Sequence, residues 1–325
     1  MRSAHGAPAV DPGAAVPSGR IAQEGKFPMS GEMGPQRQGD ALRGILLMCL
    51  GVMLFPFLNA SAKALAADYP MPMIVWARFA GHFLVMLLVF LPSAGWRIFH
   101  THRPLLQIGR SLSLMSSTAL FVTAIGSVPL ATASAIGFTT PLMVTALSVP
   151  LLGESVGPRR WSAVAVGFIG ALVIIRPGGG FSDPAVVPLL GSSACYAIYQ
   201  IATRRGGLHD SAETAIVYAA LVGTVATSLA IPFFFEMPRS LFDGLLFVAL
   251  GCFGGFGHYL VVRAFRLGPA AVISPLGYAE LIGSVILGYF IFGNFPDLWT
   301  WVGSVIIIAS GVYIALRERR LRAGA

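Results

Sequence analysis

The sequence predicts an all-α polytopic membrane protein whose ten transmembrane helices form two five-helix repeats of inverted topology. Three observations lead to this fold class. The composition is 55% hydrophobic and only 11% charged, with a mean hydropathy of +0.75. The apolar residues form runs of about 18 to 24, each long enough to cross a hydrocarbon core of roughly 30 Å as a helix. The basic residues alternate in a way that orients these runs, and the second half of the chain repeats features of the first.

The predicted elements begin after an N-terminal tail. Residues 1–40 are rich in Gly, Ala and Pro and contain no apolar run, so we expect a disordered cytoplasmic tail. The first repeat is expected over 41–176 and the second over 185–316, before a basic cytoplasmic C-terminus at 317–325. Proline and glycine residues separate the apolar runs. The ten predicted spans are 43–67, 71–92, 105–126, 130–152, 159–176, 185–203, 213–235, 241–262, 269–292 and 298–316.

The Lys and Arg residues orient the spans, because these residues are enriched in cytoplasmic loops. With the N-terminus in the cytoplasm, the 22 Lys and Arg residues fall on the cytoplasmic side apart from a few exceptions. Lys63, Arg176 and Arg239 fall on the other side, and Arg78 lies inside a span. If one helix had been missed, every later loop would lie on the other side of the membrane and this bias would disappear. The bias therefore predicts a multi-pass inner-membrane protein with both termini in the cytoplasm.

An internal repeat relates the third-to-fifth spans to the eighth-to-tenth when the sequence is shifted by 140 residues. The matched pairs are Pro129 and Pro269, Ser134 and Ser274, Gly137 and Gly277, Phe138 and Tyr278, Gly153 and Gly293, and Trp161 and Trp301. Because each half holds an odd number of spans, the halves must insert with opposite orientations. Such repeats are typical of secondary transporters, whose substrate site lies near the midplane between the repeats.

With this repeat, the sequence resembles the EamA family of the drug/metabolite transporter superfamily over about residues 41–320. The matching stretches are AKAL at 62–65, WAR at 76–78, SAIGFTTPL at 134–142, LLGE at 151–154 and SPLGYAELIGSVILGYFIFG at 274–293. The resemblance implies a ten-helix transporter that moves small metabolites, often outward, with coupling to an ion gradient. One position departs from the family pattern. Glu154 ends the first-half motif, but its second-half equivalent is Asn294, so a paired acidic gate is incomplete here.

Ionisable groups inside a bilayer are candidates for function, because each costs at least roughly 2.5–3.5 kcal/mol at the bilayer centre. Glu280 is the only carboxylate deep in a predicted span, about 16 Å from its start. It follows Pro275 and Gly277, which could interrupt the helix. Glu280 is a candidate proton carrier or partner of a cationic substrate group. The alternative is a structural ion pair with Arg78, which could instead hold a substrate carboxylate or phosphate.

Further polar residues extend this candidate substrate site. His82 lies one turn from Arg78 on the same helical face, although a histidine satisfied within the interior is the commoner arrangement, for His82 as for His258. Lys63 lies near the outer interface and is expected to extend its charge toward the surface. The complete candidate set is Glu280, Arg78, Tyr278, Tyr196, Tyr199, Gln200, Asn59 and His82.

The spacing of Tyr196, Tyr199 and Gln200 places all three on one face of the sixth predicted span. This arrangement suits the polar wall of a pocket. The alternative for each residue alone is a hydrogen bond that holds neighbouring helices together.

The basic composition and the cysteines exclude other kinds of partner. The net charge of +8 is explained by membrane-orienting residues, so no nucleic-acid partner is expected. The three cysteines lie in apolar runs without metal-ligand spacing, and no nucleotide-binding loop is present, so we expect neither a metal nor a cofactor. No feature of the sequence indicates an oligomeric state.

Two alternatives to a transporter remain open from the sequence. A lipid-modifying membrane enzyme would need clustered polar residues at one interface, but His100, His102 and His209 lie in loops without paired carboxylates. A non-transport membrane subunit would leave the repeat and the buried charges unexplained. We therefore expect no enzyme. The prediction is a transporter in the lipid bilayer that moves a small polar or zwitterionic metabolite, in the direction of export, with coupling to protons.

Overall fold

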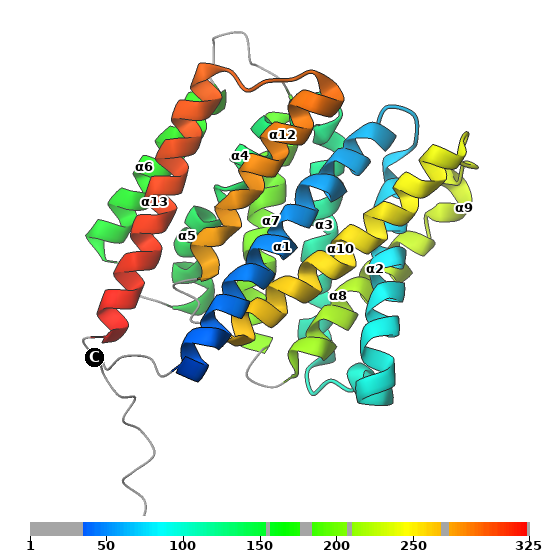
Figure 1. Cartoon of the computed structure of the whole chain (residues 1–325), viewed down its shortest axis with the longest axis horizontal. Helices are drawn as coiled ribbons and strands as arrows, with labels where there is room; N and C mark the ends of the chain where they lie inside the picture. Colours follow the sequence, from blue (N-terminus) through cyan, green and yellow to red (C-terminus); the bar gives the residue numbers. More distant parts are fainter. Residues whose placement is uncertain (1–34, 154–156, 176–183, 207–209, 268–272, 324–325) are drawn as a thin grey trace, which may run out of the picture.

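The computed structural model describes residues 35–153, 157–175, 184–206, 210–267 and 273–323, which form helices and connections without a strand (Figure 1). The helices of the first half are α1 (Pro35–Leu65), α2 (Met71–Ala94), η1 (Gly95–Phe99), α3 (Pro104–Ile125), α4 (Leu130–Gly137), α5 (Thr140–Leu152) and α6 (Pro158–Ile175). Those of the second half are α7 (Val186–Gly206), α8 (Ala212–Ser228), α9 (Ile231–Phe234), α10 (Leu241–Leu267), η2 (Ser274–Ala279), α12 (Glu280–Phe292) and α13 (Leu298–Ala323).

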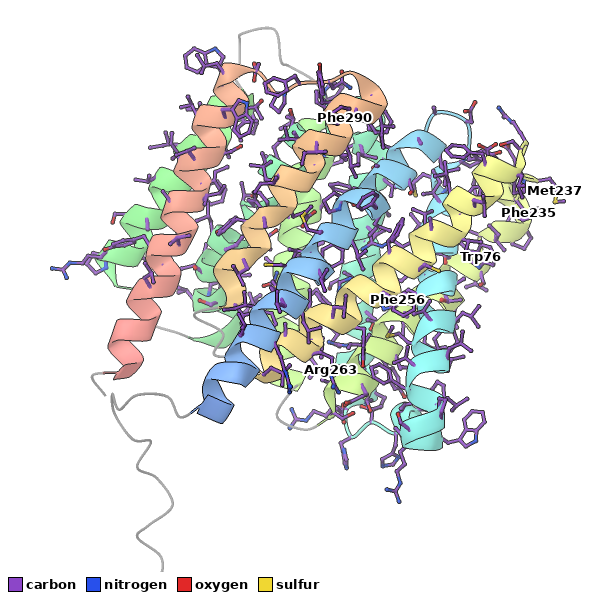
Figure 2. The ribbon with its side chains drawn as sticks, viewed as in Figure 1. Trp76, Phe235, Met237, Phe256, Arg263 and Phe290 are labelled. Carbon is purple, nitrogen blue, oxygen red and sulfur yellow. The ribbon has the colours of Figure 1, made fainter. Side chains whose placement is uncertain are left out.

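Many of these helices are suited to a membrane. Within the described residues, 6 helical segments are long and apolar enough to cross one: Leu42–Leu65, Met71–Phe99, Pro104–Ile125, Leu130–Leu151, Val186–Thr203 and Leu241–Phe265. Shorter apolar helices are Trp161–Ile175, Ala212–Ser228, Leu276–Phe292 and Leu298–Ile314. Large apolar side chains such as Phe256 and Phe290 point outward from the bundle (Figure 2). This surface suits lipid, and the chain is a multi-pass membrane protein.

Several helix boundaries differ from the predicted spans. α1 begins at Pro35, inside the segment expected to be disordered, and residues 1–34 lie outside the described residues. The predicted span 130–152 is divided into α4 and α5, because Pro141 has no N–H to continue the helical hydrogen bonds and its ring displaces the preceding turn. At the break, Thr139 Oγ1 donates to the Ile136 carbonyl at 2.7 Å. α8 similarly ends at Ser228, before the short proline-containing α9.

The matching span of the second half is also interrupted. η2 precedes α12, and the connection between α10 and residue 273 lies outside the described residues. Gly153 ends α5 and Gly293 ends α12, each with a φ of 67°. This left-handed conformation favours glycine, which has no Cβ to clash. The two glycines that the repeat matches in sequence therefore end equivalent helices in the same way.

Helices from the two halves pack in corresponding combinations. α1 packs on α10 as α7 packs on α3, and α1 packs on α12 as α7 packs on α5. α6 and α13 form a pair along one edge of the bundle (Figure 1). There Gly170 meets Gly303, while Ser310 donates a hydrogen bond to the carbonyl of Ala163. Ala163 precedes Gly170 in α6, whereas its partner Ser310 follows Gly303 in α13. The two helices therefore run antiparallel.

A close crossing joins α2 to α10. A Cβ on Gly81 would lie 2.6 Å from the Gly251 Cα, so the two backbones touch at this point. One turn along, a Cβ on Gly255 would lie 2.9 Å from the Val85 side chain. Small residues allow this close approach, which gives helices in a membrane their van der Waals contact.

Candidate functional site

Four helices bring polar side chains together inside the bundle. Asn59 of α1, Arg78 of α2, Tyr196 of α7 and Glu280 of α12 are each half-buried. Asn59 Nδ2 donates a hydrogen bond to Glu280 Oε1 at 3.2 Å. Arg78 and Tyr196 lie within electrostatic range of Glu280 and of each other. Two of these helices belong to each half of the chain, so these four residues, here called the central cluster, lie between the halves.

Glu280 owes its position to the interruption that the sequence predicts. It is the first residue of α12 and directly follows η2, which contains Pro275 and Gly277. The N-terminus of a helix carries a partial positive charge, which stabilises a nearby carboxylate. The Asn59 amide adds one hydrogen bond. Together they allow a carboxylate to stand in the interior without a direct ion pair.

Arg78 has no hydrogen bond and no direct ion pair with another described residue, including Glu280. Its guanidinium carbon lies 5.8 Å from the centroid of the Phe79 ring. The described structure therefore shows no direct contact between Arg78 and Glu280, so the structural ion pair that was the alternative is not observed. A guanidinium has five N–H donors in a fixed fork, which can bind a carboxylate or phosphate. In the described structure these donors are not used by protein acceptors.

On α7, Tyr199 extends the central cluster from Tyr196. The rings of Tyr196 and Tyr199 are stacked, with centroids 5.5 Å apart. The Tyr199 ring also lies 5.4 Å from the guanidinium carbon of Arg110. Arg110 falls among the cytoplasmic residues by sequence, but it is only 2% exposed and donates to Gln107, to Thr203 and to a backbone carbonyl. Arg110 lies about two turns into α3, and a basic residue at that depth in a helix is the sequence signal that could have predicted a buried charge.

In the described part of the chain, two candidate residues make no hydrogen bond with the central cluster. The Tyr278 ring contacts Phe138 edge-on, with centroids 5.1 Å apart, and its hydroxyl approaches Gly311 of α13. Tyr278 and Glu280 are two residues apart on helical backbone, which turns their side chains to opposite faces. Gln200 is half-buried on α7 and makes no hydrogen bond with another described residue. The structure therefore shows no hydrogen bond from either residue to Asn59 or Glu280, although Gln200 lies one turn from Tyr196 on α7.

A histidine pair occupies the α2–α10 crossing. His82 and His258 stack with ring centroids 5.3 Å apart and planes 5° from parallel. His82 is 2% exposed, and its Nε2 is the one buried side-chain nitrogen or oxygen in the described residues that has no hydrogen-bond partner. The expectation of a satisfied interior histidine is therefore wrong for His82. A buried polar atom without a partner costs stability, which points to a role other than packing.

Lys63 does not extend to the surface as expected. Its side chain is buried, and Nζ donates to the carbonyls of Ile125 and Val128 at 2.7 Å each and of Gly126 at 3.3 Å. These carbonyls lie at the C-terminus of α3, where a helix leaves carbonyls unpaired and carries partial negative charge. Lys63 therefore caps α3 and is structural.

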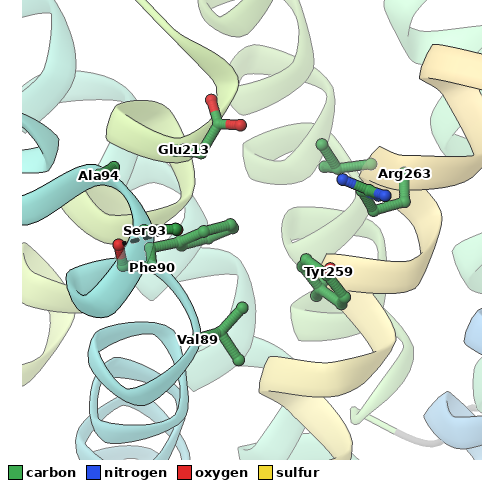
Figure 3. Close-up of a pocket in the computed structure, with 8 residues that line it drawn as sticks. Val89, Phe90, Ser93, Ala94, Glu213, Tyr259 and Arg263 are labelled. Atoms are coloured by element: carbon green, nitrogen blue, oxygen red, sulfur yellow. Dashed lines mark hydrogen bonds between the residues drawn. The ribbon is translucent and has the colours of Figure 1, made fainter.

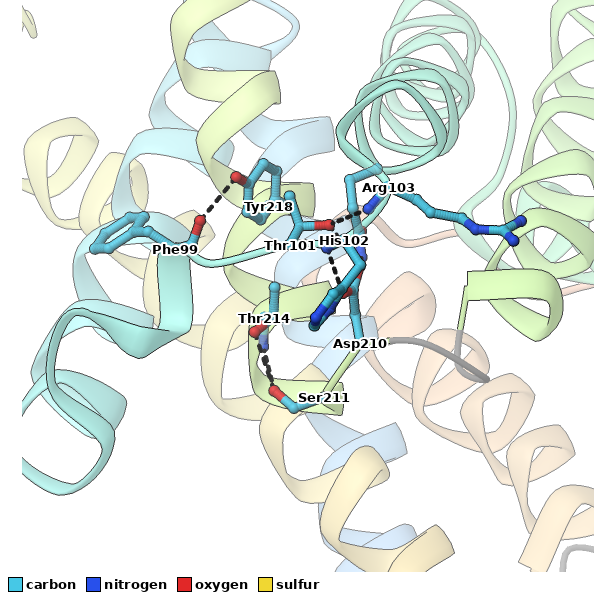
Figure 4. Close-up of polar contacts among 9 residues, drawn as sticks. Phe99, Thr101, His102, Arg103, Asp210, Ser211, Thr214 and Tyr218 are labelled. Atoms are coloured by element: carbon cyan, nitrogen blue, oxygen red, sulfur yellow. Dashed lines mark hydrogen bonds and ion pairs between the residues drawn. The ribbon is translucent and has the colours of Figure 1, made fainter. Parts of the chain in front are cut away.

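One polar contact set joins loops of the two halves (Figure 4). It lies at the end of the bundle that carries most of the described arginines. Asp210, in the α7–α8 connection, accepts hydrogen bonds from Thr101 at 2.6 Å, from Gln107 at 2.7 Å and from the His102 backbone N–H at 3.0 Å. His102 Nδ1 also lies 3.3 Å from Asp210, so the expectation that this histidine has no carboxylate partner is wrong. We call these residues the Asp210 contact set and this end the arginine-rich end.

The hydrogen bonds at Asp210 stabilise its charged form. Burial alone would raise the pKa of this carboxyl group, because its side chain is only 3% exposed. The bonds from Thr101, Gln107 and His102 outweigh burial and hold the pKa well below its usual range. Asp210 is thus a charged anchor between loops of the two halves.

A second contact set lies at the opposite end. Tyr69, between α1 and α2, donates to Asp243 of α10 at 2.8 Å and accepts the Arg239 backbone N–H at 2.7 Å. The Arg239 guanidinium binds Asp68 at 3.0 Å. Burial is the main reason that the pKa of Tyr69 is raised, so the hydroxyl keeps the proton that it donates. We call these residues the Tyr69 contact set. It joins the α1–α2 connection to the α8–α10 connection, as the Asp210 contact set joins α7–α8 to α2–α3.

Interior charged and polar groups between two halves, inside an apolar helical bundle, define a membrane transport protein. The chain belongs to the EamA-like transporter family, whose sequence profile matches residues 42–176 and again 184–316. The two matches confirm that the chain is built from two copies of one family unit. Glu154, which the family motif singles out, lies outside the described residues.

Named relatives transport different molecules. An S-adenosylmethionine uptake transporter of Rickettsia prowazekii is 30% identical over 236 residues, covering 73% of this chain and 80% of the relative. A riboflavin transporter of Vibrio cholerae is 27% identical over 283 residues, covering 86% and 95%. The pseudopaline exporter CntI of Pseudomonas aeruginosa is 29% identical over 286 residues, covering 85% and 97%. A solved crystal structure shares the fold with a TM-score of 0.60 at 19% identity, over 88% of this chain and 99% of that one.

Proposed function

We propose that the protein is a secondary active transporter that moves a small zwitterionic metabolite across the inner membrane by alternating access, with coupling to protons. The central cluster is the observation that carries this proposal. It offers one acidic group, Glu280, and one guanidinium, Arg78, from opposite halves of the chain. Neither charge is neutralised by direct contact with the other, so a ligand with both charges would satisfy both.

We propose ten membrane-spanning helices in two repeats of inverted topology, with both termini in the cytoplasm. The six long apolar segments together with the shorter apolar helices support this number. The antiparallel packing of α6 on α13 supports the inversion, because these helices are the last of each half. The start of α1 and the end of α13 lie at the same end of the bundle (Figure 1).

The two contact sets support alternating access. Each one joins a loop of the first half to a loop of the second half, at opposite ends of the molecule. Opening a path from the central cluster to one side would separate the contact set at that side while the other stays closed. An inverted repeat is expected to place two similar contact sets at opposite ends of the molecule.

The relatives support a transported molecule with several polar groups. The relatives include uptake transporters and an exporter, so members of the family work in both directions. We propose an amino-acid-like or other zwitterionic compound as substrate and export as the physiological direction. The stacked pair Tyr196 and Tyr199 would support an apolar or planar part of such a molecule.

The first test is thermal stabilisation of the purified protein across a library of zwitterionic metabolites at pH 6 and pH 8. A ligand at about 100 times its dissociation constant adds roughly 2.7 kcal/mol of stability. A ligand that stabilises wild type but loses most of this effect in Glu280→Gln identifies both the substrate class and the site. Glu236→Gln, in an exposed loop, is the control and keeps the effect. If Glu280→Gln keeps every stabilising ligand at both pH values, the central cluster is not the substrate site.

A further inference from the structure

A pocket separate from the central cluster opens at the arginine-rich end between α2, α8 and α10 (Figure 3). Its volume is about 170 Å³. The residues that line it are Val89, Phe90, Ser93, Ala94, Glu213, Tyr259, Val262 and Arg263. The edge-on contact of Phe90 with Tyr259, with centroids 5.7 Å apart, forms part of its wall.

Arg263 supplies a cation at this pocket. Its side chain is exposed and turns toward the space between α8 and α10, with its guanidinium carbon 6.0 Å from the Tyr259 ring centroid. Within the described residues it has no hydrogen bond or ion pair. Ring contact orients a guanidinium without using its N–H donors, which remain able to bind a phosphate with two parallel hydrogen bonds.

Glu213 supplies an opposite charge on the facing helix. It lies in the first turn of α8 and lines the same pocket as Arg263. A ligand between them would present an anionic group to Arg263 and a cationic group to Glu213.

Apolar side chains continue from the pocket toward the middle of the bundle. Phe256, Tyr259 and Arg263 follow one another along one stripe of α10 at helical spacing. Phe256 is 45% exposed. Arg263 and Phe256 are about 10 Å apart along the helix axis. A charged site at the end of the bundle with exposed apolar surface one to two turns deeper fits an amphiphile rather than a soluble solute.

We propose that this pocket binds a phospholipid with an amine headgroup, such as phosphatidylethanolamine, from the leaflet at the arginine-rich end. The phosphate binds Arg263, the ammonium lies beside Glu213, and an acyl chain covers Phe256. Basic pockets between transmembrane helices commonly hold lipid headgroups. The site lies outside the central cluster and is independent of which metabolite is transported.

The test is native mass spectrometry and thermal unfolding of delipidated protein titrated with phosphatidylethanolamine, phosphatidylglycerol or soluble phosphoethanolamine. Wild type retains phosphatidylethanolamine in preference to phosphatidylglycerol. Arg263→Ala weakens retention of both lipids by about tenfold, the effect expected for losing a charge-assisted contact. Glu213→Gln removes the preference and leaves phosphatidylglycerol bound. Arg103→Ala, which removes an exposed arginine of the same end outside the pocket, binds like wild type.

Three outcomes would overturn the proposal. The first is equal lipid retention by Arg263→Ala and wild type. The second is an equal effect of soluble phosphoethanolamine and the lipid, which would mean that the pocket takes a soluble ligand. The third is unchanged headgroup preference in Glu213→Gln. Because Arg263 is exposed, its removal leaves the core intact, and the baseline unfolding temperature of each variant separates loss of folding from loss of lipid.

Discussion

At the scale of single residues, interior polar groups divide by whether protein atoms satisfy them. Lys63 and Arg110 are buried and bonded to several acceptors, so their charges hold helices together. Arg78 and His82 lack such acceptors in the described structure. Unsatisfied groups are costly in a membrane interior, so they are the residues that a ligand or proton can satisfy.

Replacing His82 by leucine should separate stability from function. Because His82 Nε2 has no partner, His82→Leu should leave the free energy of unfolding within about 1 kcal/mol of wild type or raise it. Binding of the substrate identified by thermal stabilisation should weaken. Unfolding in denaturant and ligand-dependent stabilisation measure the two effects. A less stable variant that binds substrate normally would show that His82 is structural.

Replacing Lys63 by methionine should destabilise the protein. The apolar side chain keeps the volume but leaves the carbonyls of Ile125 and Val128 without their donor, at a cost of about 1–3 kcal/mol. Denaturant unfolding measures the loss. Arg103→Met, at an exposed position, is the control and should unfold like wild type. Equal stability of the two variants would mean that water replaces Lys63 as the cap of α3.

At the scale of helices and loops, two kinds of contact hold the elements. Glycines bring α2 against α10 through backbone contact, whereas short polar contact sets join the connecting loops. The first kind is insensitive to pH and intolerant of added volume. The second depends on charge and can separate without disturbing the packing of the helices.

Asp210→Asn should remove a pH-dependent part of the stability. A carboxyl group whose pKa is depressed by folding stabilises the protein above its unfolded value, near 3.9, and loses this contribution as the pH falls through the folded value. At pH 7 the variant should be about 1–3 kcal/mol less stable. The difference from wild type should shrink below about pH 4. Thermal unfolding from pH 3 to 7 measures it, and a constant difference would contradict this role.

Gly251→Ala should weaken the α2–α10 crossing. Its new Cβ would meet the Gly81 backbone, with the His82 nitrogen at 3.1 Å, so the helices must separate. Thermal stability should fall by more than about 1 kcal/mol. Gly244→Ala is the matched control on the same helix, where no atom lies within 4 Å of the added Cβ. It should be neutral or stabilising by about 0.5–1 kcal/mol, and equal effects of the two changes would contradict the close crossing.

At the scale of the whole molecule, the orientation can be tested from both ends. Trp96 in η1 is 78% exposed at the arginine-rich end, and Met237 is 75% exposed at the other. In cells, a membrane-impermeant thiol reagent should label Met237→Cys directly and Trp96→Cys only after permeabilisation. The half-buried native cysteines are first replaced by serine or alanine. Labelling of both positions in intact cells, or the reverse order, would contradict the proposed topology.

The sequence is sufficient to predict the class, the family and the positions of most helices. Long apolar runs indicate membrane-spanning helices directly, since a helix satisfies the hydrogen bonds of its own backbone within the membrane. Proline and glycine mark helix ends by local geometry, which is why the repeat pairs Gly153 with Gly293 and both end a helix in the same conformation. The family resemblance is confirmed by the matched profile. The break at Pro141 is not predicted, because a run of apolar residues hides an interruption that lies within the membrane.

Which polar residues meet is decided only by the tertiary structure. Helical spacing identifies side chains that share a face, but the partner of each face comes from a helix far away in the chain. Asn59 and Glu280 are 221 residues apart, and Asp210 meets Thr101 across 109. The prediction that Lys63 reaches the surface is wrong, because the sequence pattern does not say which carbonyl groups lie across the helix interface. The sequence by itself determined a membrane protein of two related halves, since that follows from local hydrophobicity and the internal repeat, and its family resemblance indicated a transporter. The arrangement of charges between the halves depends on long-range packing, which only the folded structure contains.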